Sequence, residues 1–169
     1  MMKKFLDKIP AWIIYLTTLF VFLILIFSSF RYLLFKSNHN SNIPENLFDS
    51  AFTLGISYDT MVASYLLLIP TIGFFVALFL NHNSVWFRRA ITIYFSIVFF
   101  AVFLACSADI PYYIFTGARL NDAILLWTDT PGAMMSFVIG NPVFYFYLSI
   151  FFIGTLISIF LVVFLGNKL

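Results

Sequence analysis

The sequence predicts an all-α integral membrane protein built as a four-helix transmembrane bundle. Hydrophobic residues make up 63% of its 169 residues, charged residues make up only 9%, and the mean hydropathy is +1.03. Soluble domains contain about 45–50% apolar and about 25% charged residues. This composition leaves too little polar side-chain surface to face water, so we treat residues 1–169 as a single transmembrane domain.

Four apolar runs are long enough to cross a bilayer: residues 12–30, 61–80, 90–108 and 143–165. About 20 helical residues span a hydrocarbon core that is roughly 30 Å thick. Inside lipid, only helices and closed barrels satisfy every backbone group, and a barrel needs alternating strands of about ten residues. Because the four runs are continuous rather than alternating, each is predicted to be a helix.

The first run follows three lysines, Lys3, Lys4 and Lys8, as the apolar part of a signal peptide would. A signal peptide, however, has an apolar region of about 7–15 residues and ends at a cleavage site of small residues. This run is longer and leads to Arg31 without such a site. We therefore expect it to be retained as the first span, with Arg31 at its end.

The basic residues predict the orientation in the membrane, because lysine and arginine in short loops favour the cytoplasmic side. With the N-terminus inside, six of the nine basic residues are cytoplasmic, and Asp7 is the only one of the seven carboxylates on that side. The sequence thus predicts a multi-pass protein with both termini in the cytoplasm.

The polar segment before the second span predicts an interfacial helix. Asn42 precedes Glu45 by three positions, which is the spacing of a helix-starting capping box. Between residues 47 and 54, apolar residues recur near positions i, i+4 and i+7, with polar residues between them. This periodicity is typical of an amphipathic helix, here one that lies on the outer membrane surface before span two.

The longer polar segment, residues 109–142, contains three prolines and three glycines that interrupt any long helix. Thr130 followed by Pro131 has the chemistry of an N-cap and a first helical position. The apolar stretch 132–139 that follows is too short to cross the bilayer. We predict a short interfacial or re-entrant helix before span four.

The candidate functional residues are polar groups at the outer ends of the spans: Asp59, Asp109, Arg119 and Asn121. A charge at that depth costs a few kcal/mol unless it is paired or hydrated. We therefore predict that Asp59, Asp109 and Arg119 form one cluster at the outer boundary. Two roles remain open: an ion-pair latch between spans two and three, or a pocket for a lipid headgroup in which Arg119 contacts phosphate.

No catalytic, cofactor-binding or metal-binding residue is predicted. His39 and His82 fall in loops on opposite sides, and neither has a second ligand at metal-binding spacing. The sequence contains no glycine-rich phosphate loop, no nucleophile elbow and no zinc-protease motif. The net charge of +2 gives no indication of nucleic-acid binding.

Two segments carry recognisable polar spacings. Residues 54–70, LGISYDTMVASYLLLIP, contain a Gly-x-x-x-Asp element at Gly55 and Asp59, followed by A-x-Y-L-L-L-x-P. Residues 108–122, ADIPYYIFTGARLND, contain an aspartate, paired tyrosines and a G-x-R-L-N element. In these features the chain resembles the N-terminal membrane domain of lipoteichoic-acid-synthase-like phosphoglycerol transferases, which belong to the sulfatase/alkaline-phosphatase superfamily.

The resemblance implies five spans in the bacterial cytoplasmic (inner) membrane and an extracytoplasmic catalytic domain with a threonine nucleophile and a divalent metal, expected to be manganese. This enzyme class moves phosphoglycerol from a lipid donor. The present sequence ends at Leu169, after the fourth span, so no nucleophile or metal ligand can be assigned to it. We expect a truncated membrane-anchor domain that is inactive alone, with the lipid bilayer, an anionic phospholipid and a separately encoded catalytic domain as partners.

Two other functions compete with this interpretation. The chain would suit a small membrane subunit that packs against a partner and binds no ligand. A transporter subunit is less favoured, because no span carries an ionisable residue near its middle and the sequence has no internal repeat.

Overall fold

The computed structural model describes residues 10–37, 45–80, 85–120, 132, 136 and 139–167, and all its regular structure in these residues is helical. Four long helices are present: α2 (Ala11–Ser37), α3 (Glu45–Phe79), α4 (Val85–Thr116) and α6 (Pro142–Gly166). All four are long and apolar enough to cross a membrane, which confirms the predicted four-helix transmembrane bundle. The chain is a multi-pass membrane protein.

Each helix is longer than the span predicted for it. α2 continues six residues past Arg31 to Ser37, where the sequence analysis placed the end of the first span at Arg31. Arg31 is tolerated within the helix because its charge is neutralised by a neighbouring helix, as shown below. Arginine, leucine and lysine are also good helix formers, so nothing in this segment stops the helix.

The interfacial helix predicted before span two is not a separate element. Its described residues form the first part of α3, which runs without interruption from Glu45 to Phe79. The weakest helix former at the expected junction is Gly55, and a glycine inside a helix costs only about 1 kcal/mol relative to alanine. The predicted cap at Asn42 lies outside the described residues, as does most of the short helix predicted at 132–139.

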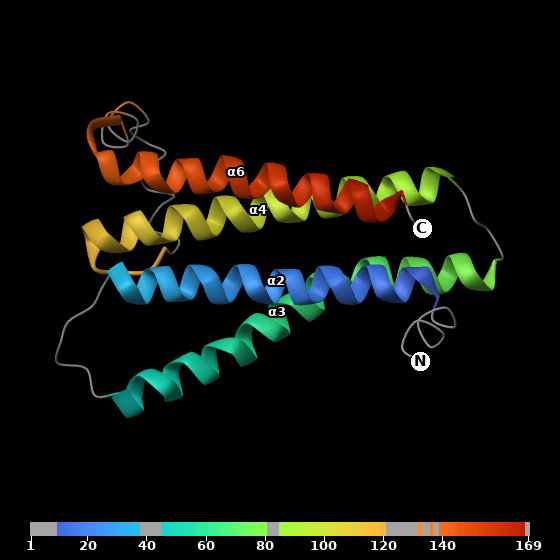
Figure 1. Cartoon of the computed structure of the whole chain (residues 1–169), viewed down its shortest axis with the longest axis horizontal. Helices are drawn as coiled ribbons and strands as arrows, with labels where there is room; N and C mark the ends of the chain where they lie inside the picture. The colour runs from blue at the N-terminus through green and yellow to red at the C-terminus, as the bar shows by residue number, and fades with distance from the viewer. Residues whose placement is uncertain are drawn as a thin grey trace.

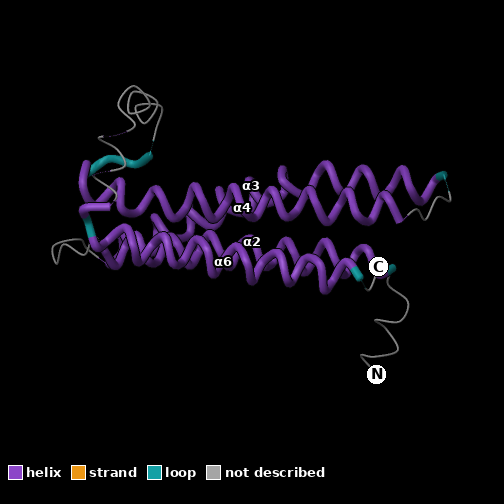
Figure 2. Tube along the Cα trace, turned by 90° about the horizontal axis from the view of Figure 1, so that it is seen from above, coloured by secondary structure: helices purple, strands orange, loops and turns teal. Residues whose placement is uncertain are grey.

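The helices form two layers, with α3 and α4 in one and α2 and α6 in the other (Figure 2). α4 and α6 are antiparallel and pack along most of their length (Figure 1). Gly154 of α6 permits this close approach, because the buried ring of Phe103 occupies the space that a side chain at position 154 would need. Small residues have this role at many transmembrane helix contacts.

α3 is the helix that departs from this parallel arrangement. It lies against α2 near the middle of the bundle and diverges from α2 towards its own N-terminal end (Figure 1). The opening between them lies at the end of the bundle where α2 finishes and α3 begins. α2 begins and α6 ends at the opposite end, as expected for an even number of crossings.

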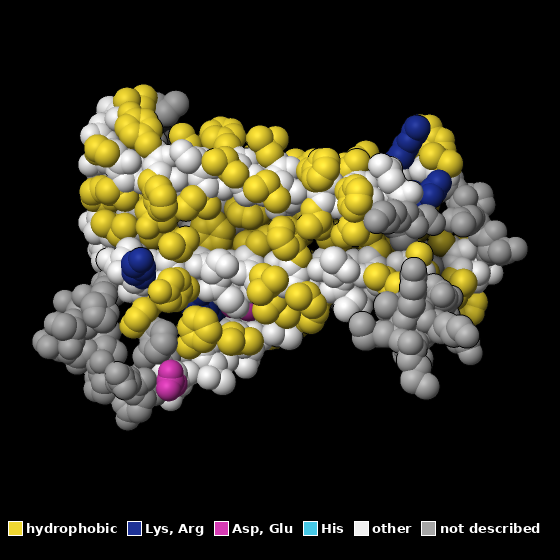
Figure 3. Space-filling view, viewed as in Figure 1, with side chains coloured by type: hydrophobic (Ala, Val, Ile, Leu, Met, Phe, Trp, Pro, Cys, Tyr) yellow, Lys and Arg dark blue, Asp and Glu magenta, His cyan; other side chains and the backbone are white. Residues whose placement is uncertain are grey.

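Aromatic rings fill the centre of the bundle. Phe95 and Phe99 of α4 are fully buried, and Tyr15 of α2 meets the Phe95 ring edge-on with 5.8 Å between centroids. Other phenylalanines face outwards, among them Phe160, which is 72% exposed. Hydrophobic side chains cover the middle of the face drawn in Figure 3, and charged ones lie mostly towards its two ends. Such a surface suits lipid rather than water.

α3 contains a proline, and a side chain of α4 replaces the backbone hydrogen bond that this proline removes. Pro70 has no N–H and therefore leaves the carbonyl of Leu66, four residues earlier, without its helical donor. The hydroxyl of Tyr94 on α4 donates a hydrogen bond of 2.8 Å to this carbonyl. A backbone carbonyl without a donor is costly in lipid, so Tyr94 both satisfies α3 and fixes α4 beside it.

We expect Tyr94→Phe to lower the free energy of unfolding in detergent by about 0.5–1.5 kcal/mol, the net worth of one hydrogen bond. In a Pro70→Ala background the loss should be much smaller, because an alanine amide supplies the missing donor within α3. Tyr65→Phe, at a 62% exposed position on α3, serves as the control and should change the free energy of unfolding little. Equal losses from Tyr94→Phe in both backgrounds would contradict this account.

Candidate functional site

Two ion pairs lie at the end of the bundle where α3 diverges. Nη2 of Arg31, on α2, is 2.7 Å from Oδ1 of Asp59, on α3. Nη2 of Arg119, just after α4, is 2.6 Å from Oδ2 of Asp109, near the end of α4. The first pair joins two helices, whereas the second fixes the segment that follows α4.

Gly55 explains how Arg31 reaches Asp59. The Arg31 guanidinium lies where a Cβ atom at position 55 would be, so any larger residue would collide with it. Residues four apart share one face of a helix, and Gly55 precedes Asp59 by four. Arg31 therefore crosses the bare backbone at Gly55 and meets the carboxylate one turn further on. The Gly-x-x-x-Asp spacing seen in the sequence therefore supplies both the space for this arginine and the carboxylate that it binds.

Gly117 brings Arg119 back to Asp109. Its φ of +70° lies in the left-handed region, which glycine adopts at little cost, and its N–H donates to the carbonyl of Tyr113 at 2.9 Å. This arrangement is a common way to end a helix. The chain then turns so that the backbone N–H of Leu120 donates to Oδ1 of Asp109 at 2.8 Å. Asp109 thus holds the reversed segment through both of its oxygens.

The two arginines differ in exposure. The Arg31 side chain is 27% exposed and that of Asp59 is 12% exposed, whereas Arg119 is 67% exposed beside a mostly buried Asp109. Nε of Arg31 and Oδ2 of Asp59 have no hydrogen-bond partner among the described residues. A two-pronged arginine–carboxylate contact would use both atoms. The buried bridge therefore contains one hydrogen bond where its chemistry allows two.

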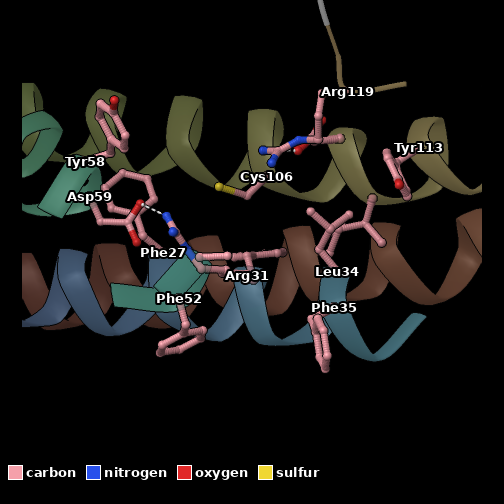
Figure 4. Close-up of a pocket in the computed structure, with 14 residues that line it drawn as sticks. Phe27, Arg31, Leu34, Phe35, Phe52, Tyr58, Asp59, Cys106, Tyr113 and Arg119 are labelled. Atoms are coloured by element: carbon pink, nitrogen blue, oxygen red, sulfur yellow. Dashed lines mark hydrogen bonds and ion pairs between the residues drawn. The ribbon is translucent and has the colours of Figure 1, made fainter. Parts of the chain in front are cut away.

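Both ion pairs line a single pocket of about 670 Å³ between α2, α3 and α4. Its walls are largely aromatic and aliphatic, with Phe27, Phe52 and Cys106 among them. Figure 4 shows Arg31 directed at Asp59 on one side and Arg119 near Cys106 on another. A mostly apolar pocket of this size with a few converging polar groups is typical of a small-molecule or cofactor site.

The pocket brings Asp59, Asp109 and Arg119 together and adds Arg31 to them. Arg119 is predicted to lie close to both Asp59 and Asp109; in the structure it bonds to Asp109, and Asp59 is bonded to Arg31. Arg31 was treated only as the end of a span. Arg31 was predicted at the same depth as Asp59 and carries the opposite charge, and these two properties could have indicated that the two residues pair. Asn121 lies outside the described residues.

The polar groups of the pocket are two arginine–aspartate pairs. No group of three or more histidine, cysteine or carboxylate side chains is placed there to hold a metal ion. Each of the two pocket carboxylates is engaged by an arginine. The site therefore offers guanidinium donors beside an apolar wall, a combination suited to an amphipathic anion.

Comparisons of the chain with models of protein families, with curated proteins and with solved structures found no match. The resemblance to phosphoglycerol transferases therefore stays a prediction drawn from residues 54–70 and 108–122. The class of the protein, a helical multi-pass membrane protein, follows from its four membrane-crossing helices.

We expect Gly55→Ala and Arg31→Ala each to lower the free energy of unfolding by about 1–3 kcal/mol, less than the 3–5 kcal/mol typical of fully buried pairs because Arg31 is partly exposed. Both changes disrupt the same bridge, so the double variant should lose little more than either single variant. Thermal and chemical unfolding in detergent measure this.

Gly140→Ala is the matched control for the glycine substitution. Gly140 is helical and exposed, and a side chain at this position would meet nothing within 4 Å. Additive losses for the Gly55→Ala and Arg31→Ala pair would show that Gly55 acts independently of the bridge.

Proposed function

We propose that the chain is the membrane domain of a lipoteichoic-acid-synthase-like phosphoglycerol transferase. In this role it anchors a catalytic domain at the outer face of a bacterial cytoplasmic membrane. The observation that supports the proposal is a convergence. The two segments that carry the resemblance contribute Asp59, Asp109 and Arg119 to the walls of one pocket.

This convergence matters because apolar spans share hydrophobic runs by chance, but chance matches have no reason to meet in space. Gly55 and Asp59 receive Arg31, and Gly117 turns the chain so that Arg119 meets Asp109. In both segments, the matched polar residues that the structure describes therefore help to form an arginine–aspartate pair at the same pocket. A shared site, rather than shared composition, is the property that a family motif preserves.

In this proposal the membrane domain positions the catalytic domain and takes no part in the chemical steps. In the family that the chain resembles, the threonine nucleophile and the divalent metal belong to the catalytic domain. The membrane domain holds that domain close to the headgroup layer, where its lipid donor lies. Holding reactants at a fixed distance and orientation is itself a large contribution to catalysis.

A small membrane interaction subunit is the second candidate function. It is favoured by the part of α3 that diverges from α2, where apolar side chains such as those of Leu54 and Ile56 are exposed. A partner helix could cover this surface, but lipid covers it equally well. Association with a catalytic partner, tested below, separates the two functions.

The proposed orientation places both termini in the cytoplasm and the loop between α2 and α3 outside. A reporter active only outside the cytoplasm should be silent when fused after Leu169 and active when inserted in that loop. The expected pattern follows from six basic residues on the inner side against three on the outer. Activity of the reporter after Leu169 would overturn the orientation.

We expect the purified 169-residue chain to show no turnover of a phosphatidylglycerol donor, with or without Mn²⁺, relative to a vector-only preparation. Co-expression with the polypeptide encoded next to it should yield a complex that contains a sulfatase-like domain and transfers phosphoglycerol. Turnover by the chain alone, or a neighbouring frame without such a domain, would refute the proposed function.

A further inference from the structure

We infer that the pocket between α2, α3 and α4 binds the phosphate-bearing headgroup of an anionic lipid, with Arg119 as the phosphate contact and the Arg31–Asp59 pair as a structural bridge. The sequence analysis treated latch and pocket as alternatives for one cluster. The geometry assigns them to two different ion pairs. This inference rests on the pocket itself and holds whether or not the proposed function is correct.

Arg119 has the properties of a ligand-binding residue. Its side chain is 67% exposed, and a guanidinium carries five N–H donors. In the described part of the chain, the contact from its Nη2 to Asp109 is its one ion pair. Asp109 in turn accepts from the N–H of Leu120, so the backbone beside Arg119 is held in place, and the guanidinium lies at the wall of the pocket near Cys106 with further N–H donors besides the one at Asp109 (Figure 4). Planar guanidinium donors match the geometry of phosphate oxygens.

Arg31 has the opposite character. Its guanidinium is packed over Gly55 and directed at Asp59, and the pair is mostly buried. Moving Arg31 to an incoming anion would leave the Asp59 carboxylate buried without its partner, which is strongly unfavourable. Arg31 therefore maintains the spacing of α2 and α3, and Arg119 is left to meet the ligand.

The walls of the pocket favour a lipid over a dissolved anion. Phe27 and Leu34 of α2 and Phe52 of α3 line it, and its volume of about 670 Å³ far exceeds that of a phosphate group. A phosphate ion would satisfy Arg119 and leave the apolar walls uncovered. A phospholipid presents both parts in the correct order, with the phosphate at the charged side and the glycerol and upper acyl carbons against the aromatic rings.

Native mass spectrometry of the full chain in detergent, titrated with phosphatidylglycerol or phosphatidylcholine, tests the inference. We expect a preference for phosphatidylglycerol that Arg119→Gln removes, with about tenfold weaker binding, as for the loss of one charge-assisted hydrogen bond. Arg89→Gln is the matched control: Arg89 is exposed at the other end of α4 and does not line the pocket. Thermal unfolding without lipid should fall only slightly in Arg119→Gln, because Arg119 is 67% exposed and Asp109 keeps the hydrogen bond from the N–H of Leu120.

A second pair of variants tests the pocket without changing any charge. Ala51 lines the pocket, so Ala51→Trp should fill part of it and weaken phosphatidylglycerol binding. Thr53 is exposed two residues further along α3 and does not line the pocket, so Thr53→Trp should leave binding unchanged. This pair decides the matter if Arg119→Gln fails to fold.

Three outcomes would overturn the inference. Equal binding of the two lipids would show that the site does not select for negative charge. Loss of stability in Arg119→Gln with lipid preference intact would show that Arg119 is a latch. Displacement of the lipid by millimolar glycerol 3-phosphate would assign the site to a dissolved phosphate ester instead of a lipid.

Discussion

A charged side chain near the end of a membrane span is stable only with a partner, and this constraint determines how α2 and α3 meet. Arg31 and Asp59 each face a desolvation cost at this depth that their contact offsets. The contact forms only because Gly55 leaves the face of α3 bare along the path of the arginine. The first turns of α3 can therefore diverge while the two helices remain connected, and the pocket lies within the angle between them.

The sequence allowed the fold to be predicted because the membrane reduces the choices. The length of each apolar run sets the number of helices, and lipid excludes most other backbone structures. It did not show that the segment before span two continues that span, because an amphipathic pattern on the surface and one at a helix end look alike. The sequence has no strong helix breaker between the two segments, because the glycine at position 55 costs a helix only about 1 kcal/mol.

For the candidate site, it was easier to predict which residues belong to it than which of them form ion pairs. Asp59, Asp109 and Arg119 were identified from depth and charge, but depth does not reveal which helix lies beside which. Placing α2 next to α3 gives Asp59 a nearer partner, Arg31, and leaves Arg119 to Asp109. The role of Gly117 was also beyond sequence reasoning, because a glycine in a polar segment marks an interruption without giving the direction of the turn.

The hydrogen bond from Tyr94 to the carbonyl of Leu66 holds α3 at one point along its length. It fastens the middle of the helix to α4 at the position where Pro70 has removed the internal bond. Gly55 lies 15 residues away from Pro70, which is about 22 Å along a helix. A bend of about 20° at the proline, the size that prolines commonly produce, would move Gly55 sideways by about 8 Å. Such a movement would break the Arg31–Asp59 bridge, so the bridge and the Tyr94 hydrogen bond hold α3 at two separate points and together fix the width of the pocket.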